Sequence, residues 1–161
     1  MAAKAVRHMD LDSLLLVNRS VVQLSGEAHE FTKADGEKLK ELLAEAEARA
    51  ANEQFEAAVI DKASLLVFRL ASGQHFKAGN KRTALVAGLV FLRKNGYKID
   101  LKSDDFVAVV DRVGVAAASL DDLFTVMSRL TKKSPTERKG WDKAISQQVS
   151  SNRKTLTDLG A

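Results

Sequence analysis

The chain of 161 residues contains no cysteine, a single proline, and one residue each of tryptophan and tyrosine. Without cysteine, neither a disulfide framework nor a thiolate metal site can form, which is compatible with a reducing compartment. No apolar run approaches the roughly 20 residues of a membrane-spanning helix, and residues 1–12 lack the uninterrupted apolar stretch of a signal peptide. The sequence therefore predicts a cytoplasmic protein that does not engage a membrane.

The formal net charge of +4 comes entirely from the C-terminal part of the chain. Residues 1–130 contain 18 Lys and Arg against 18 Asp and Glu, whereas residues 131–161 contain seven against three. A folded nucleic-acid reader would carry a basic stripe on its domain, so nucleic acid is not expected as a partner except weakly, through the tail. The length suits one domain. We predict a domain over residues 1–133 and a basic helical extension over residues 134–161.

Helical periodicity dominates and strand signals are scarce, which predicts an all-α fold. Asp12 or Ser13 is expected to cap a first helix, and Asp35 is expected to cap a second, alanine-rich helix. A third helix is predicted to end at Ser72, with Gly73 taking the left-handed conformation that commonly closes a helix.

Further helix signals follow in the second half of the chain. Residues 119–122 have the Ser-x-x-Asp form of a capping box and precede a helix in which Phe124 and Met127 are predicted to fill the core. Residues 134–137, Ser-Pro-Thr-Glu, repeat the start signal and predict a last helix. Its Trp141 is expected to pack on the domain, with anchoring of a partner as the alternative.

The segment from Gln74 to Thr83, with the sequence QHFKAGNKRT, is the most informative part of the chain. A glycine-asparagine turn and two cations open directly into the apolar run of residues 84–92. Gly79 permits a turn that a side chain would resist, and the first amides of the following helix have no partner within it. Lys81 and Arg82 add full positive charges. This combination predicts a phosphate-binding turn.

This segment, together with the Phe-Leu-Arg-Lys-Asn-Gly sequence of residues 91–96, resembles the Fic/Doc superfamily, and specifically its Doc-like (death-on-curing) branch. The resemblance covers roughly residues 9–130 and includes an Asp-x-x-x-Leu segment that starts at Asp35. It implies a helical bundle around a central helix that follows the phosphate-binding turn. It also implies transfer of a phosphoryl or nucleotidyl (AMP) group from ATP or another nucleoside triphosphate to a protein hydroxyl.

Members of that superfamily carry His-x-Phe-x-Asp/Glu-x-Asn, whose histidine takes the proton from the target hydroxyl and whose acidic residue helps to hold magnesium on the nucleotide. With Phe76, Gly79 and Asn80 aligned, Gln74 stands at the histidine position and Ala78 at the acidic one. A glutamine amide has no useful basicity near neutral pH, so it can position a hydroxyl but cannot accept its proton. The resemblance therefore implies impaired transfer, and Mg²⁺ would bind without its usual acidic ligand.

The resemblance also assigns the other site residues. It implies that the phosphates are held by Gly79, Asn80, Lys81 and Arg82, with Thr83 supporting the start of the helix. Gln74 and His75 are the catalytic candidates. Either His75 moves into the catalytic place, in a loop one residue shorter than usual, or it lies at the surface of a degenerate loop or helps to bind phosphate. Gln74 is either a natural loss or an introduced substitution, and the simultaneous absence of an acid at Ala78 favours natural divergence.

Two functions remain open after the sequence is read. In Doc-like members the acceptor is a threonine of a translation elongation factor, and a small antitoxin silences the toxin; the resemblance implies such partners here. The alternative is a catalytically inactive module of the same fold that binds a nucleotide, a phosphorylated ligand or another protein. Residues 25–32, with Gly26, His29 and Phe31, are either the flap that docks the target polypeptide or an ordinary loop.

Overall fold

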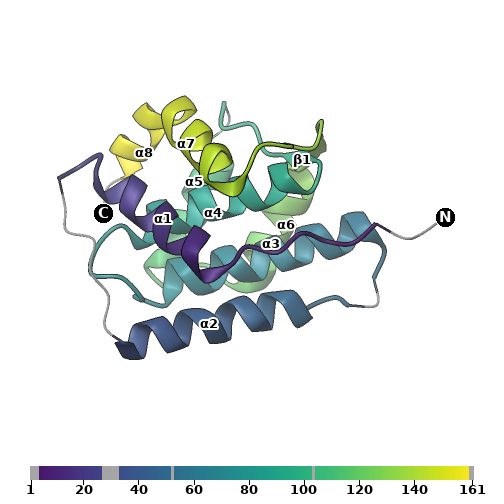
Figure 1. Ribbon diagram of the computed structural model, residues 1–161, viewed down its shortest axis with the longest axis horizontal. Coiled ribbons are helices and arrows are strands. Elements are labelled where there is room, and N and C mark those ends of the chain that lie inside the picture. Colours follow the sequence, from purple (N-terminus) through teal and green to yellow (C-terminus); the bar gives the residue numbers. More distant parts are fainter. Residues whose placement is uncertain (1–3, 27–32, 52, 103, 160–161) are drawn as a thin grey trace.

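The computed structural model describes residues 4–26, 33–51, 53–102 and 104–159. Within these ranges the helices are α1 (Leu11–Val22), α2 (Lys33–Ala48), α3 (Phe55–Ser72), α4 (Asn80–Lys94), α5 (Asp105–Gly114), α6 (Leu120–Leu130), α7 (Trp141–Ser151) and α8 (Arg153–Leu159). Two short strands, β1 (Tyr97–Lys98) and β2 (Lys132–Lys133), pair antiparallel with Tyr97 opposite Lys133. The predicted all-α fold is confirmed (Figure 1).

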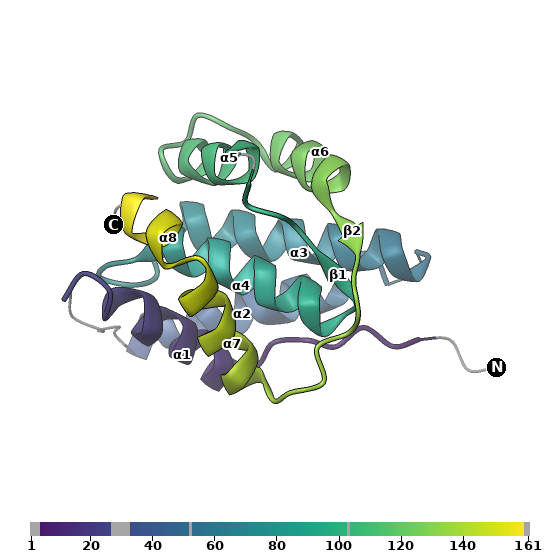
Figure 2. The same ribbon diagram turned by 90° about the horizontal axis from the view of Figure 1, so that it is seen from above.

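Helix α4 is the central element of the bundle. It packs along α3, while α1 and α7 cover one side of it and α5 lies on the other with α6 (Figure 2). Helix α2 lies along α3 (Figure 1). Every residue from Arg82 to Leu92 is buried. A helix that is apolar all round belongs in a core, so the run of residues 84–92 accounts for this central position.

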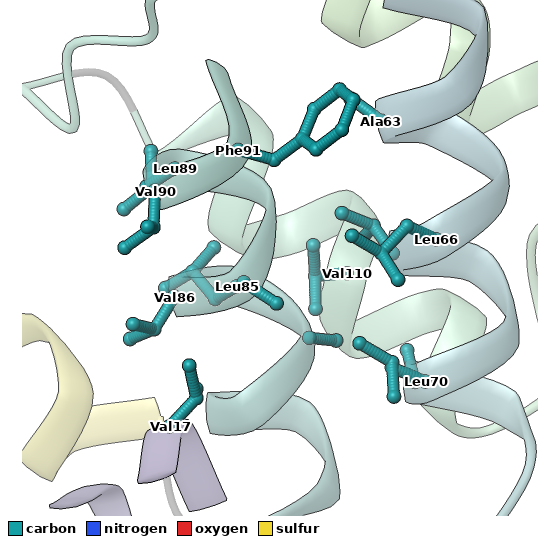
Figure 3. Packing of buried hydrophobic residues seen from close by; sticks show 14 of the residues in the cluster. Val17, Ala63, Leu66, Leu70, Leu85, Val86, Leu89, Val90, Phe91 and Val110 are labelled. Carbon is teal, nitrogen blue, oxygen red and sulfur yellow. The ribbon is translucent and has the colours of Figure 1, made fainter. Parts of the chain in front are cut away.

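The main core lies where α3 and α4 cross. Leu66 and Leu70 of α3 face Leu85 of α4, and Val17 of α1 and Val110 of α5 close the cluster (Figure 3). The close approach of the two helices depends on a small residue at the crossing. A Cβ atom added at Gly88 would lie 2.5 Å from Cγ2 of Val67, so a side chain there would push α4 away from α3.

The predicted helix starts are only partly correct. Helix α1 is capped by Asp10, whose carboxylate accepts a hydrogen bond of 2.8 Å from the amide of Ser13, so Asp12 and Ser13 lie inside the first turn. Asp35 also lies in the first turn of its helix and is not the residue before it. An acidic residue is favourable in either position because both face the positive end of the helix dipole. The capping box at residues 119–122 is confirmed.

The helix start predicted at residues 134–137 is wrong. The Ser134 amide donates to the carbonyl oxygen of Gly96 at 2.9 Å, and the Glu137 amide donates to that of Arg93 at 2.9 Å. These bonds, with the preceding strand pair, hold the segment extended against the end of α4. Helix α7 therefore begins only at Trp141, whose ring lies 5.6 Å from Nζ of Lys94.

The position of α6 explains why one predicted core residue is not buried. Helix α6 packs mainly on α3 and α5, so one of its sides is buried. Met127 is fully buried there, as predicted, but Phe124 is 38% exposed and does not fill the core. The helices of residues 134–161 pack on the rest of the bundle, α7 against α4 and α1, and α8 against α4. None of the helices in the described ranges has the length and apolarity needed to cross a membrane.

Candidate functional site

The loop between α3 and α4 ends in a turn built on glycine. Gly79 caps α4 in the left-handed conformation, with φ 77° and ψ 21°. A Cβ there would lie 2.9 Å from Cγ1 of Val22, so both the backbone and the packing against α1 require glycine. Asn80, Lys81 and Arg82 form the first turn of α4. The first amides of a helix are not used by its internal hydrogen bonds, and such helix starts are typical anion-binding positions.

The Asn80 side chain shapes the loop that leads into this turn. Its Oδ1 accepts a hydrogen bond of 3.1 Å from the Phe76 amide, and its Nδ2 donates to the Phe76 carbonyl at 2.9 Å. Both residues are buried, at 7% and 4% exposure. The carboxamide therefore pins the backbone of Phe76 from both sides, and the contribution of Asn80 to phosphate binding would come from its amide.

Asn18 of α1 supports the turn through two hydrogen bonds. Nδ2 of Asn18 donates to the Ala78 carbonyl oxygen and to Oγ1 of Thr83, each at 3.0 Å. Thr83 is fully buried, in a place that suits the supporting role expected of it. Sequence reasoning missed Asn18, although a signal was present. It is a polar residue on the apolar stripe that includes Leu14 and Val21, where a buried carboxamide needs partners.

The two cations of the turn point to different elements. Nζ of Lys81 lies 2.7 Å from Oδ1 of Asp111 on α5, and both side chains are partly exposed. The lysine chain passes over Gly114, where a Cβ would lie 2.6 Å from Cε of Lys81. Asp111 belongs to no motif and could not have been found from the sequence. The pair leaves Lys81 at the edge of the turn with its charge partly balanced.

The other cation, Arg82, is turned towards the C-terminal helix and is 3% exposed. Its Nε donates to the Leu156 carbonyl at 2.7 Å, Nη2 donates to the Thr157 carbonyl at 3.3 Å, and Nη1 donates to Oγ of Ser25 at 2.8 Å. Carbonyls in the last turn of a helix lack partners within it and form its negative end. Arg82 thus caps α8, which lies at the same end of the molecule as the α3–α4 loop (Figure 2).

The loop residues before Phe76 differ from the prediction. Gly73 has φ −91° and is not left-handed, whereas Gln74 has φ 52° and is exposed. Glycine is still required at position 73, because a Cβ there would lie 2.2 Å from Nε2 of His75 and 2.6 Å from the Arg69 carbonyl oxygen. The imidazole thus folds back over the last turn of α3.

His75 is engaged with the end of α3. Burial lowers the pKa of its imidazole, while the carboxylate of Asp35 and a hydrogen bond with the Arg69 backbone oppose that shift. Within the described part of the chain, its Nδ1 is buried without a hydrogen-bond partner. A lowered pKa keeps the ring neutral near pH 7. Whether His75 or Gln74 meets an acceptor hydroxyl stays a prediction.

The turn offers few ligands to a metal ion. Ala78 offers no side-chain ligand, and its carbonyl oxygen is bonded to Asn18. Among the residues whose structure is described, no three His, Asp or Glu side chains converge to hold a metal ion. A cavity of about 330 Å³ opens beside the turn between α5 and α8, with Asp111, Val107 and Leu159 in its wall.

The segment expected to form a flap lies mostly outside the described residues, since His29 and Phe31 fall there. Gly26, at the edge, has φ 70°. A comparison with curated proteins found no match. A family model described as "Fic/DOC family" matches residues 8–92, which is more than half of the chain and includes α1, α2, α3, the turn and most of α4. The chain therefore belongs to the Fic/DOC family.

Proposed function

We propose that this chain binds the phosphates of a nucleoside triphosphate at the α3–α4 turn and is impaired in transferring a phosphoryl or AMP group to a protein hydroxyl. One observation carries the proposal. The bonds between Asn80 and Phe76 and the left-handed Gly79 hold the turn at the start of α4, while Gln74 and Ala78 supply neither a base nor an acid. These features support phosphate binding and leave proton transfer without a base.

The chemistry explains why transfer would be slow. The acceptor oxygen attacks phosphorus, the bond to the leaving ADP or pyrophosphate breaks, and the proton of the acceptor hydroxyl has to leave. Without a base at Gln74, that proton goes to solvent or to the nucleotide. A missing general base costs about 10²- to 10⁴-fold in rate. Positioning and electrostatics supply most of the catalysis in phosphoryl transfer, so residual activity is expected.

The cavity between α5 and α8 is our candidate for the nucleoside. Its volume of about 330 Å³ lies within the range of small-molecule sites. It adjoins the pair of Lys81 and Asp111, so a nucleotide with its phosphates on the turn would reach it. Val107 and Leu159 offer apolar contact to a base, and the carboxylate of Asp104 can accept from ribose hydroxyls.

A second candidate function is a non-catalytic module that binds a nucleotide, a phosphorylated ligand or another protein. The observation that favours it is the engagement of Arg82 with the carbonyls of Leu156 and Thr157, because a guanidinium donating to α8 has fewer donors left for phosphate. In either case we propose a cytoplasmic, Doc-like protein. Its proposed partners are a translation elongation factor as acceptor and a small antitoxin.

Mass spectrometry of an elongation factor incubated with magnesium-ATP tests the proposal. The unaltered chain should add little, and Gln74→His/Ala78→Asp should add a phosphate-sized or AMP-sized mass. The matched control is the same double variant with Asn80→Ala, which should lose the gain because the turn is no longer held. ATP binding without transfer by the restored variant would favour the non-catalytic module, and absence of ATP binding by the unaltered chain would refute the proposed phosphate site.

A further inference from the structure

We propose that Asn18 is a positioning residue for the phosphate turn. It would fix the peptide between Ala78 and Gly79 so that the Gly79 amide faces the phosphate together with the first amides of α4. This inference rests on the proposed function, because it assigns a role at the same site. It concerns a residue of α1 that lies 60 positions before Ala78 in the chain.

The orientation of that peptide follows from a single contact. Nδ2 of Asn18 approaches the Ala78 carbonyl oxygen from α1, at 3.0 Å. Peptide bonds in the described chain are not cis, and in a trans peptide the C=O and N–H groups point in opposite directions. With the Ala78 oxygen held towards α1, the N–H group of Gly79 points away from α1.

The conformation of the following residues places the Gly79 amide beside the next amides of the chain. Gly79 is left-handed and Asn80 begins a right-handed helix. Alternation of the two conformations brings successive N–H groups together into a concave anion site. The amides of Gly79, Asn80 and Lys81 would then donate to one phosphate.

A second bond fixes the carboxamide itself. The Ala78 oxygen can only accept, so the NH₂ group of Asn18 must face it. The same nitrogen lies 3.0 Å from Oγ1 of Thr83, and Asn18 is 1% exposed. Asn18 thereby joins the residue before the turn to the first turn of α4, and Val22 fills the space beneath Gly79.

Loss of this contact frees the peptide to rotate. A rotated peptide would withdraw the Gly79 amide and present the Ala78 carbonyl oxygen to the phosphate. A hydrogen bond to a charged group corresponds to a factor of roughly 10–100 in affinity. We therefore expect Asn18→Ala to weaken binding of magnesium-ATP and of inorganic tripolyphosphate to the full chain at least ~10-fold, as measured by calorimetry.

Asn95→Ala is a matched control at the opposite end of α4. The Asn95 carboxamide is also buried and donates to the carbonyls of Arg7 and Phe91, at 3.0 and 2.9 Å. Both variants should lower the melting temperature, because each leaves buried backbone groups unpaired. Only Asn18→Ala should weaken binding. Equal affinities of the two variants would overturn the inference.

A measurement that needs no ligand separates this inference from the proposed function. The residual dipolar coupling of the Gly79 N–H vector should change in Asn18→Ala and stay the same in Asn95→Ala. An unchanged coupling in Asn18→Ala would refute the role of Asn18, whatever ATP does. Failure of the unaltered chain to bind ATP or tripolyphosphate would instead refute the phosphate site.

Asn18→Asp keeps the test open if the alanine variant does not fold. The carboxylate has nearly the shape of the carboxamide but cannot donate to the Ala78 oxygen, so we expect the same change in coupling and the same loss of affinity. Thr83→Val removes the other partner alone and should leave the coupling of Gly79 unchanged. A change in Thr83→Val as large as that in Asn18→Asp would contradict the assignment of the effect to Ala78.

Discussion

The guanidinium of Arg82 and the carbonyl oxygen of Leu156 lie 2.7 Å apart although 74 residues separate them in the chain. The contact joins the first turn of α4 to the last turn of α8, and Leu156 is fully buried beside it. A positive charge at the C-terminal end of a helix is favourable, and here it also satisfies carbonyls that lack partners within the helix. Helix α8 is thus tied to the turn between α3 and α4.

Arg82→Ala is therefore expected to destabilise the fold as well as the site. It would lower the free energy of unfolding by about 2–4 kcal/mol, because it removes the donor to the buried Leu156 carbonyl and opens a cavity. Chemical denaturation measures the loss, and faster hydrogen exchange of residues 153–159 locates it. The control is Arg129→Ala, which breaks an exposed ion pair with Asp105 and should cost less than about 1 kcal/mol. Unchanged exchange in α8 would contradict the role of Arg82 as its cap.

Local sequence signals were enough to predict most of the helices and the glycine at the start of α4. The apolar run after Gly79 predicted a central α4, and the Ser-x-x-Asp pattern predicted the start of α6. Each of these patterns involves residues that are close together in the chain, so it can be interpreted without the rest of the fold. The start predicted at residues 134–137 failed because the amides of that segment bond to the end of α4, a contact that no local pattern contains.

The partners of the turn could not be assigned from local patterns for the same reason, even where a residue such as Asn18 signalled that it needs partners. Asn18 and Asp111 reach the turn from α1 and α5, and the α8 carbonyls reach Arg82 from the end of the chain. At Gly73 the need for glycine was predicted correctly, but for the wrong reason. Glycine is needed there to make room for His75, not for a left-handed backbone.

The pair of Lys81 and Asp111 predicts a salt-dependent change in nucleotide binding. Asp111→Asn removes the carboxylate 2.7 Å from Nζ of Lys81 and leaves the lysine charge for phosphate. ATP should bind several-fold more tightly in about 50 mM salt and similarly to the unaltered chain in about 1 M salt, where charges are screened beyond ~3 Å. Stability should change by less than about 1 kcal/mol, since both side chains are partly exposed. The matched control is Asp105→Asn on the same helix, and tighter binding in that variant would show a general charge effect instead.

The two described histidines predict loss of stability in mild acid. Burial lowers the pKa of His75 and of His8 below the ordinary value of about 6.5. As the pH falls, the unfolded chain therefore takes up protons before the folded chain does. The contribution of the two histidines to the free energy of unfolding is fully present above pH 6.5 and is lost as the pH drops towards their folded pKa values. His75→Gln should flatten this dependence in urea titrations between pH 7 and pH 5, while the share of His8 remains. An unchanged slope would mean that folding does not lower the pKa of His75.

Gly79 and Gly26 form a matched pair for testing the packing of the turn against α1. Both are left-handed, with φ 77° and 70°, so alanine at either position should cost about 1–2 kcal/mol from the backbone alone. At Gly26 an added Cβ would meet nothing within 4 Å, whereas at Gly79 it would lie 2.9 Å from Cγ1 of Val22 and 3.5 Å from Nδ2 of Asn18. Gly79→Ala should therefore destabilise the protein by about 1–3 kcal/mol more than Gly26→Ala, because overpacking adds to the backbone strain.

The same pair separates stability from binding. In Gly79→Ala the turn has to lift away from α1, which draws the Ala78 carbonyl from Asn18 and shifts the first amides of α4. The thermal stabilisation given by magnesium-ATP should then disappear in Gly79→Ala and persist in Gly26→Ala. The same difference in ATP binding should be found when each variant is measured at a temperature equally far below its own melting temperature. If both variants kept the stabilisation, the contact between Gly79 and α1 would be a matter of folding alone, and the amides of the turn would not be the phosphate donors.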